Sequence, residues 1–238
     1  MGTHLFEAIH YRNRCLHLCT VFLIACSLQA CTSVVSADPD LTEAIRWYTG
    51  EAGSVDDERA RQLLERAAVD GDPLSVMWIA RVYSTGRMTF PADKAKAIEI
   101  AESVITEVEQ LALEGDAEAN FLMGTAFAEG LGKPVNPVQA IVWYRKAAAL
   151  DNTLAQHNIG NVYASGTGVL QSDSEAVTWW LLAAEKGDAI PQFRLGEMYE
   201  RGMGVTQDIE EAMRWYRDSA NRGNKNAEAA LARLSTGN

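Results

Sequence analysis

The chain has 238 residues, of which 47% are hydrophobic, 8% aromatic and 22% charged. These values are typical of a globular protein, so they exclude a disordered, collagen-like or coiled-coil chain. The formal net charge is −11. Because nucleic-acid-binding surfaces are basic, we expect no nucleic acid among the partners of this chain.

The cysteines and histidines are distributed very unevenly. All four cysteines lie within the first 31 residues, at Cys15, Cys19, Cys26 and Cys31, and His157 is the single histidine of the remaining chain. A disulfide, a thiolate metal site or a Cys–His catalytic pair is therefore excluded after residue 31. We expect no metal and no cofactor.

The N-terminal segment has the layout of a secretory signal. Arg12 and Arg14 precede an uncharged apolar run over residues 16–28, which matches the basic and apolar regions of a signal peptide. The run ends in Leu-Gln-Ala before Cys31, and this ending resembles a bacterial lipobox. We therefore predict a signal peptide over residues 1–30 and a linker over 31–39.

This layout predicts an exported lipoprotein, periplasmic or attached to the outer membrane through a lipid on Cys31. Cys26, which follows Leu-Ile-Ala, is the second choice for lipidation. Ordinary cleavage after Ala37 is a further alternative. So is an uncleaved anchor, because residues 15–35 are just long enough to span a bilayer.

The rest of the chain repeats itself every 36 residues. The same spacing separates three glycines (Gly124, Gly160, Gly196) and three tryptophans (Trp143, Trp179, Trp215). Several further sets of residues occupy equivalent positions of successive repeats, and each such set is here called a column. A fixed period of this length indicates an array of structural repeats. We place a solenoid over residues 40–238, with repeats at about 36–71, 72–115, 116–151, 152–187 and 188–223 and a terminal helix at 224–235.

Each repeat encodes two helices, here called A and B, so the predicted fold class is all-α. Helix B begins after a good N-cap residue in every repeat: Asp56, Asp93, Asn136, Ser172 and Asp208. Three residues later Gln139, Glu175 and Glu211 predict capping boxes in the last three repeats. A glycine follows most of the helices and suits a left-handed C-terminal cap.

Two recurring columns predict how the helices pack. Gly124, Gly160 and Gly196 fall inside helix A, where glycine costs about 1 kcal/mol relative to alanine. Because this cost in helix stability recurs in three repeats, it indicates that another helix approaches closely at the glycine. The tryptophan column on helix B is interpreted as core between repeats and not as an exposed binding ladder.

The second repeat is eight residues longer than the others. One extra residue precedes Asp93, and seven lie between Ala97 and Gly115. Seven residues turn a helix by about 700°, so the buried face shifts by only about 20°. We expect a helix B that is two turns longer and still packs in the row.

Residues 195–216, with the sequence LGEMYERGMGVTQDIEEAMRWY, and residues 166–173 resemble the Sel1-like (Sel-one-like) repeat, or SLR, a relative of the tetratricopeptide repeat. Three units match strongly, over 116–223. The resemblance implies a right-handed α-solenoid of five helix-turn-helix repeats, a concave face lined by the A helices, and a role in holding other proteins together. Such repeats occur in bacterial envelope and secretion-related proteins.

Helix A also carries columns whose chemistry changes between repeats. They fall on one helical face and predict a partner-binding groove, although solvated positions that are free to vary explain them nearly as well. The groove residues are Trp78, Arg81, Thr85, Leu122, Thr125, Glu129, Asn158, Asn161, Ser165, Arg194, Glu197 and Arg201. Arg194 and Arg201 are the predicted anchors for an acidic or polar segment.

No catalytic motif is found. The chain contains no Ser-x-x-Lys, Gly-x-Ser-x-Gly or His-Glu-x-x-His, and His157 is interpreted as a half-buried structural residue. We therefore expect a non-catalytic scaffold that binds a protein partner in the cell envelope. The alternative is an enzyme or accessory factor acting on cell-wall or exopolysaccharide carbohydrate, which acidic pairs facing the groove would favour.

Overall fold

The computed structural model describes residues 38–236, which form eleven α-helices and no strand. The predicted signal peptide and both candidate lipidation sites, Cys31 and Cys26, lie outside these residues. Within residues 38–236, no helix has the length and apolar character needed to cross a bilayer. The all-α solenoid predicted from the sequence is confirmed for the described part of the chain.

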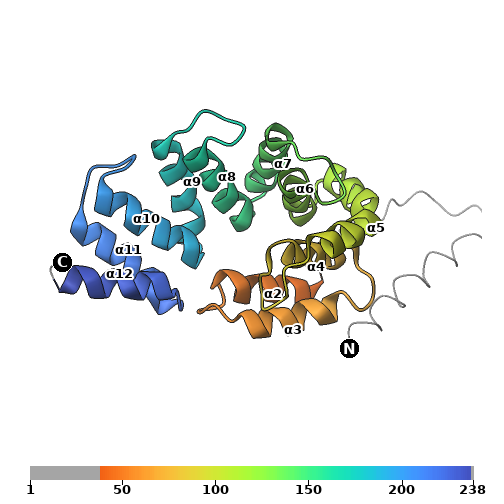
Figure 1. The fold of residues 1–238 in the computed structure, drawn as a ribbon, viewed down its shortest axis with the longest axis horizontal. Coiled ribbons are helices and arrows are strands. Elements are labelled where there is room, and N and C mark those ends of the chain that lie inside the picture. The colour runs from red at the N-terminus through yellow and green to blue at the C-terminus, as the bar shows by residue number, and fades with distance from the viewer. Residues whose placement is uncertain (1–37, 237–238) are drawn as a thin grey trace, which may run out of the picture.

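The helices alternate between A and B along the chain and follow one another around an arc (Figure 1). The A helices are α2 (Pro39–Thr49), α4 (Pro73–Thr85), α6 (Ala117–Glu129), α8 (Thr153–Ser165), α10 (Ala189–Arg201) and α12 (Lys225–Ser235). The B helices are α3 (Asp57–Ala67), α5 (Lys94–Leu113), α7 (Pro137–Ala149), α9 (Asp173–Glu185) and α11 (Ile209–Asn221).

The predicted N-caps of the B helices are confirmed. Each cap side chain accepts a hydrogen bond from the backbone N–H three residues later, as Ser172 does from Glu175. The reciprocal half of the predicted capping box is wrong, because the N–H of Ser172 donates to the carbonyl of Tyr163 at 3.0 Å. The equivalent bond recurs in all five repeats and closes each A-to-B loop.

The glycine column marks a close approach between A and B, as predicted. A Cβ atom on Gly124 would lie 2.4 Å from the ring of Tyr144, and one on Gly160 equally close to Trp180. In the fifth repeat Gly196 lies against the ring of Tyr216 in the same way. Each helix A therefore gives up a side chain so that an aromatic ring of helix B can lie directly on its backbone.

The tryptophan column is buried, although less uniformly than predicted. Trp143 and Trp215 are 8% and 5% exposed, whereas Trp179 is only partly buried. The neighbouring Trp180 is 3% exposed because its ring packs directly on the backbone of Gly160, where a side chain would otherwise lie. The most buried aromatic column is therefore the one that follows the tryptophans.

The long second repeat behaves as predicted. Helix α5 has 20 residues, whereas α7, α9 and α11 have 13 each. Buried residues continue through the additional turns, at Val104, Val108 and Ala112. The inserted seven residues therefore lengthen the helix without turning its apolar face away from the row.

The two ends of the row of repeats meet, which the sequence did not predict. The guanidinium of Arg222 donates to the carbonyl of Gly50 at 2.6 Å, and the N–H of Val55 donates to the carbonyl of Arg222 at 2.8 Å. Figure 1 shows the loop between α2 and α3 beside the turn between α11 and α12. The first and last repeats thus close the arc into a ring.

Candidate partner-binding cavity

The ring encloses a partly open cavity of about 830 Å³. Its walls come from α8 and α10 on one side and from the first two repeats on the other, through Tyr48, Asp57 and residues 86–89. Segments from opposite ends of the described row of repeats therefore face each other across the cavity.

Helix α8 contributes a stripe of polar side chains to the cavity. His157, Asn161 and Ser165 follow one another at intervals of four residues, so they lie on one face of the helix. The side-chain oxygen of Asn161 accepts a hydrogen bond from the indole nitrogen of Trp180 at 3.2 Å. This bond leaves the amide NH₂ group of Asn161 available to a ligand.

Helix α10 contributes the charged stripe Arg194, Glu197 and Arg201. Arg194 forms an ion pair with Glu197 at 2.8 Å. Arg201, by contrast, is exposed and makes no ion pair with any residue between 38 and 236. Arg201 interacts electrostatically with the neighbouring Glu200, and its exposed guanidinium lines the cavity.

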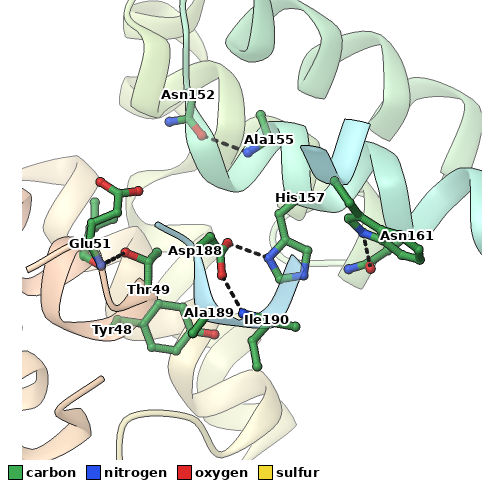
Figure 2. A network of polar contacts seen from close by, with 12 residues as sticks. Tyr48, Thr49, Glu51, Asn152, Ala155, His157, Asn161, Asp188, Ala189 and Ile190 are labelled. Atoms are coloured by element: carbon green, nitrogen blue, oxygen red, sulfur yellow. Dashed lines mark hydrogen bonds and ion pairs between the residues drawn. The ribbon is translucent and has the colours of Figure 1, made fainter. Parts of the chain in front are cut away.

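His157 has a partner that the sequence did not reveal. Its Nδ1 atom donates to a carboxylate oxygen of Asp188 at 2.8 Å (Figure 2). The side chains of His157 and Asp188 are 14% and 2% exposed, so the histidine is more buried than expected. The second carboxylate oxygen of Asp188 accepts from the N–H of Ile190 at the start of α10. The pair thereby connects α8 with α10.

The opposite wall was not predicted, because its residues lie outside the variable columns of helix A. Arg87, in the loop after α4, donates to the hydroxyl of Tyr48 at 3.0 Å. Asp57 is the first residue of α3. Burial, together with the neighbouring Asp56, raises the pKa of Asp57 above its usual value. A sequence alone does not show that the first repeat folds back to this place.

Four predicted groove residues do not reach the cavity, and the prediction is wrong for them. Trp78 and Leu122 are fully buried, and Arg81 and Thr125 are 2% and 1% exposed. They lie in the core between α4, α6 and α7. A partner cannot contact them in this structure.

The reason is a bridge between successive A helices. The indole nitrogen of Trp78 donates to Glu118 of the next repeat at 2.6 Å, and the ring of Trp78 packs on Phe121 at a centroid distance of 5.8 Å. Glu118 also accepts from Asn152 at 2.9 Å, one repeat further on. Burial raises the pKa of Glu118 to about 7.

Arg81 is enclosed by this bridge. Its guanidinium lies 4.4 Å from the ring of Trp78 and 5.2 Å from that of Phe121, and its Nε and Nη1 atoms are buried without a hydrogen-bond partner. The aromatic faces and the carboxylate of Glu118 compensate its charge. Arg81 is thus a core residue.

The remaining predicted groove residues lie near the cavity but not in its wall. Glu129 is partly buried and accepts a hydrogen bond from Ser84 at 2.5 Å. Asn158 is partly buried and hydrogen-bonds Tyr144. Thr85 is exposed at the end of α4. The structure therefore brings together Asn161, Ser165, Arg194, Glu197 and Arg201 from the predicted set.

Two solved structures share this architecture. The Sel1 repeat protein from Oxalobacter formigenes is 29% identical, with a TM-score of 0.54 over 82% of this chain and 57% of its own length. The protective antigen c5321 of uropathogenic Escherichia coli, which displays an SLR fold, is 25% identical, with a TM-score of 0.52 over 82% and 48%. The chain thus spans about half the length of these proteins.

A comparison with curated proteins found no significant match. The Sel1 repeat profile matches residues 35–49, 48–72, 117–152, 153–188 and 192–224, which is more than half of the chain. The unmatched stretch between 72 and 117 contains the lengthened helix α5. On this match, the chain belongs to the Sel1 repeat family.

Proposed function

We propose that this protein is a non-catalytic interaction scaffold of the bacterial cell envelope, exported and held to the membrane by a lipid on Cys31, and that its partner binds in the cavity. Sel1 repeat proteins are generally scaffolds for protein–protein interaction. The observation that carries the proposal for this chain is the cavity between α8 and α10, which combines hydrogen-bonding, cationic and aromatic side chains.

The charges in the cavity favour an acidic or polar segment of the partner. Glu197 is neutralised by Arg194. Asp173 is the first residue of a helix, where the helix dipole stabilises a negative charge, whereas burial and Asp56 raise the pKa of Asp57 and disfavour its charged form. Arg201 interacts electrostatically with Glu200 but makes no direct ion pair within residues 38–236, so a carboxylate of the partner would pair with it.

The environments of these charged groups also argue against the alternative, an enzyme acting on cell-wall or exopolysaccharide carbohydrate. Glycoside hydrolysis needs two carboxyl groups that both face the reacting bond, one of them free to donate a proton. In this cavity Glu197 is engaged in an ion pair and Asp173 lies at a helix start, so Asp57, whose pKa is raised, is not matched by a second free carboxyl group among them. The mixed composition of the walls supports binding over catalysis.

Site-specific photo-cross-linking tests the cavity. A photoreactive residue at Asn161 or Ser165 is expected to give partner adducts in cells, whereas one at Arg217, which is exposed on α11, gives none. The double change Arg194→Glu and Arg201→Glu should abolish the adducts with little effect on melting, because exposed charges contribute little to stability. Adducts from Arg217 alone would place recognition on the outer surface.

The lipid anchor is tested separately. Intact-mass analysis of protein extracted from membranes should show a diacylated Cys31 at the N-terminus, and Cys31→Ala should release the protein from the membrane. An unmodified N-terminus at Asp38 would refute the anchor, and a lipid on Cys26 would move it to the second candidate.

A further inference from the structure

The cavity depends on the meeting of the first and the last repeat of the described row. Tyr48 and Asp57 come from the first repeat, and Arg194 and Arg201 come from the fifth. If the ends separated, these walls would no longer face each other. The contacts that join the ends, which we call the seam, therefore control whether the cavity is closed.

The seam consists of the loop 50–55 on one side and the turns 187–189 and 222–223 on the other. Arg222 makes the two hydrogen bonds described above, to Gly50 and from Val55. The chains approach so closely that a Cβ atom on Gly50 would lie 3.5 Å from the Cβ atom of Ala189. Gly187 likewise leaves room for the guanidinium of Arg222, which lies 2.7 Å from where its Cβ atom would be.

A partly buried acid also lies in the seam. Glu51 accepts a hydrogen bond from Thr153 and lies near Asp188 at the start of α10, as Figure 2 shows. Burial raises the pKa of Glu51, and the charge of Asp188 adds to the effect. The hydrogen bond from Thr153 and the charges of Lys186 and Arg46 act in the opposite direction, so Glu51 lies in a mixed electrostatic environment between the first repeat and α8 and α10.

The seam is weak in comparison with the rest of the ring. Its bonds are a few polar contacts between loops, each contributing about 0.5–1.5 kcal/mol, whereas successive repeats share buried aromatic side chains such as Trp78 and Phe121. In a solenoid each repeat packs mainly on its neighbours, so small rotations between repeats can part the ends without disrupting the core.

The size of the cavity restricts what it can hold. Its volume of about 830 Å³ lies near the upper end of the range for ligand pockets, whereas a folded partner buries about 800 Å² of its own surface in a typical interface. The stripe from His157 to Ser165 is about 12 Å long, the length of roughly four residues of extended chain. These dimensions fit one extended polypeptide segment.

From these observations we infer that the cavity holds a single extended acidic segment of the partner, and that the seam opens to admit the segment and closes around it. The inference rests on the proposed function, because it takes the cavity as the binding site. It adds the form of the partner and the route by which the partner enters.

A disulfide across the seam provides the test. In the full chain, with the four N-terminal cysteines changed to serine, Gly50→Cys and Ala189→Cys would place the two Cβ atoms about 3.5 Å apart, within the disulfide range. Gly50 has a left-handed φ of 92°, where other residues are strained. Gly50→Cys alone and the reduced double variant therefore serve as controls.

Two probes report on the seam: a fluorescein-labelled peptide of six glutamates, and the same peptide placed between two folded fluorescent proteins, which cannot thread through a closed ring. We expect the reduced variant to bind both. Oxidation before mixing should slow association of the flanked probe at least tenfold, and oxidation after mixing should slow its dissociation at least tenfold.

The outcomes separate this inference from the proposed function. Equal association of the flanked probe with the oxidised and reduced variants would overturn the opening of the seam and leave the cavity as a binding site. Failure of the reduced variant to bind either probe, or unchanged binding after Arg201→Glu, would overturn the acidic segment and the inference with it. Arg222→Ala, which weakens the seam, should speed association of the flanked probe.

Discussion

The A helices of the second and third repeats differ from those of the fourth and fifth on the face toward the ring. In α4 and α6 the first two variable columns are buried in the core, with Trp78 and Leu122 fully buried. In α8 and α10 all of these positions except Asn158 line an open cavity, with Asn161 and Arg194 exposed. One repeat geometry thus yields a solid core in one half of the ring and a binding surface in the other.

The difference originates in the size of the side chains. Trp78 is long enough to bridge to Glu118 on the next A helix, and Phe121 fills the space beside it. Arg194 instead pairs with Glu197 on its own helix, so nothing from this column bridges to the next repeat. A repeat column therefore predicts where a residue lies, and the bulk of its neighbours decides whether water or a partner can reach it.

The largest expected effect lies in the filled half. Trp78→Ala should lower the free energy of unfolding by about 3–5 kcal/mol, because it opens a cavity in a fully buried site and removes a donor from Glu118. Arg194→Ala, at the matching offset of α10, should change it by less than about 0.5 kcal/mol. Urea denaturation measures both, and similar losses for the two variants would erase the contrast between the halves.

Glu118→Gln should change how the stability of the protein depends on pH. Since burial raises the pKa of Glu118 to about 7, the folded protein holds this proton more tightly than the unfolded chain, and its stability falls as the pH rises from about 4.5 to about 7. Glutamine still accepts from Trp78 and carries no charge, but its NH₂ group cannot accept from Asn152 and it leaves Arg81 without a countercharge. Relative to its difference from the wild type at low pH, the variant should gain up to about 3 kcal/mol at pH 8.

This gain should shrink toward zero below pH 4.5, where Glu118 is protonated in both states. Thermal melts of the wild type and the variant across this pH range give the comparison directly. A constant difference at all pH values would show that Glu118 does not titrate in this way.

The packing of helix A against helix B within one repeat should be equally tight in the filled and the open half of the ring. Gly124→Ala in α6 and Gly160→Ala in α8 should each cost about 1–3 kcal/mol, because the added Cβ atom would lie 2.4 Å from Tyr144 or Trp180. Denaturant midpoints measure the two costs. A large loss at Gly124 with none at Gly160 would mean that the open half is loosely packed throughout.

His157→Phe tests the open half on its own. The apolar residues Met77, Phe121 and Phe193 occupy this column in other repeats, which would predict a neutral change. Because the substitution leaves the buried carboxylate of Asp188 without its imidazole partner, we expect a loss of about 1–3 kcal/mol in the free energy of unfolding. If urea denaturation finds the variant as stable as the wild type, the pair contributes nothing to folding.

The sequence was sufficient for the local structure. The 36-residue period, the N-caps from Asp56 to Asp208, the interior glycines and the seven-residue extension of α5 were all read correctly, because each depends on residues close in sequence or on a strict repeat. The same reasoning misplaced Arg81 and Thr125, since helical periodicity gives the face of a helix but not what covers it.

The tertiary structure alone decided the ring and its cavity. The curvature that brings Arg222 to Gly50 is the sum of small rotations between successive repeats, and each rotation depends on how bulky side chains such as Trp78 fill the gap to the next helix. The pairing of His157 with Asp188 needs only two neighbouring repeats, but it joins side chains 31 residues apart and leaves no local pattern either. The contact between Arg222 and Gly50 exists only once all the repeats between them have been stacked.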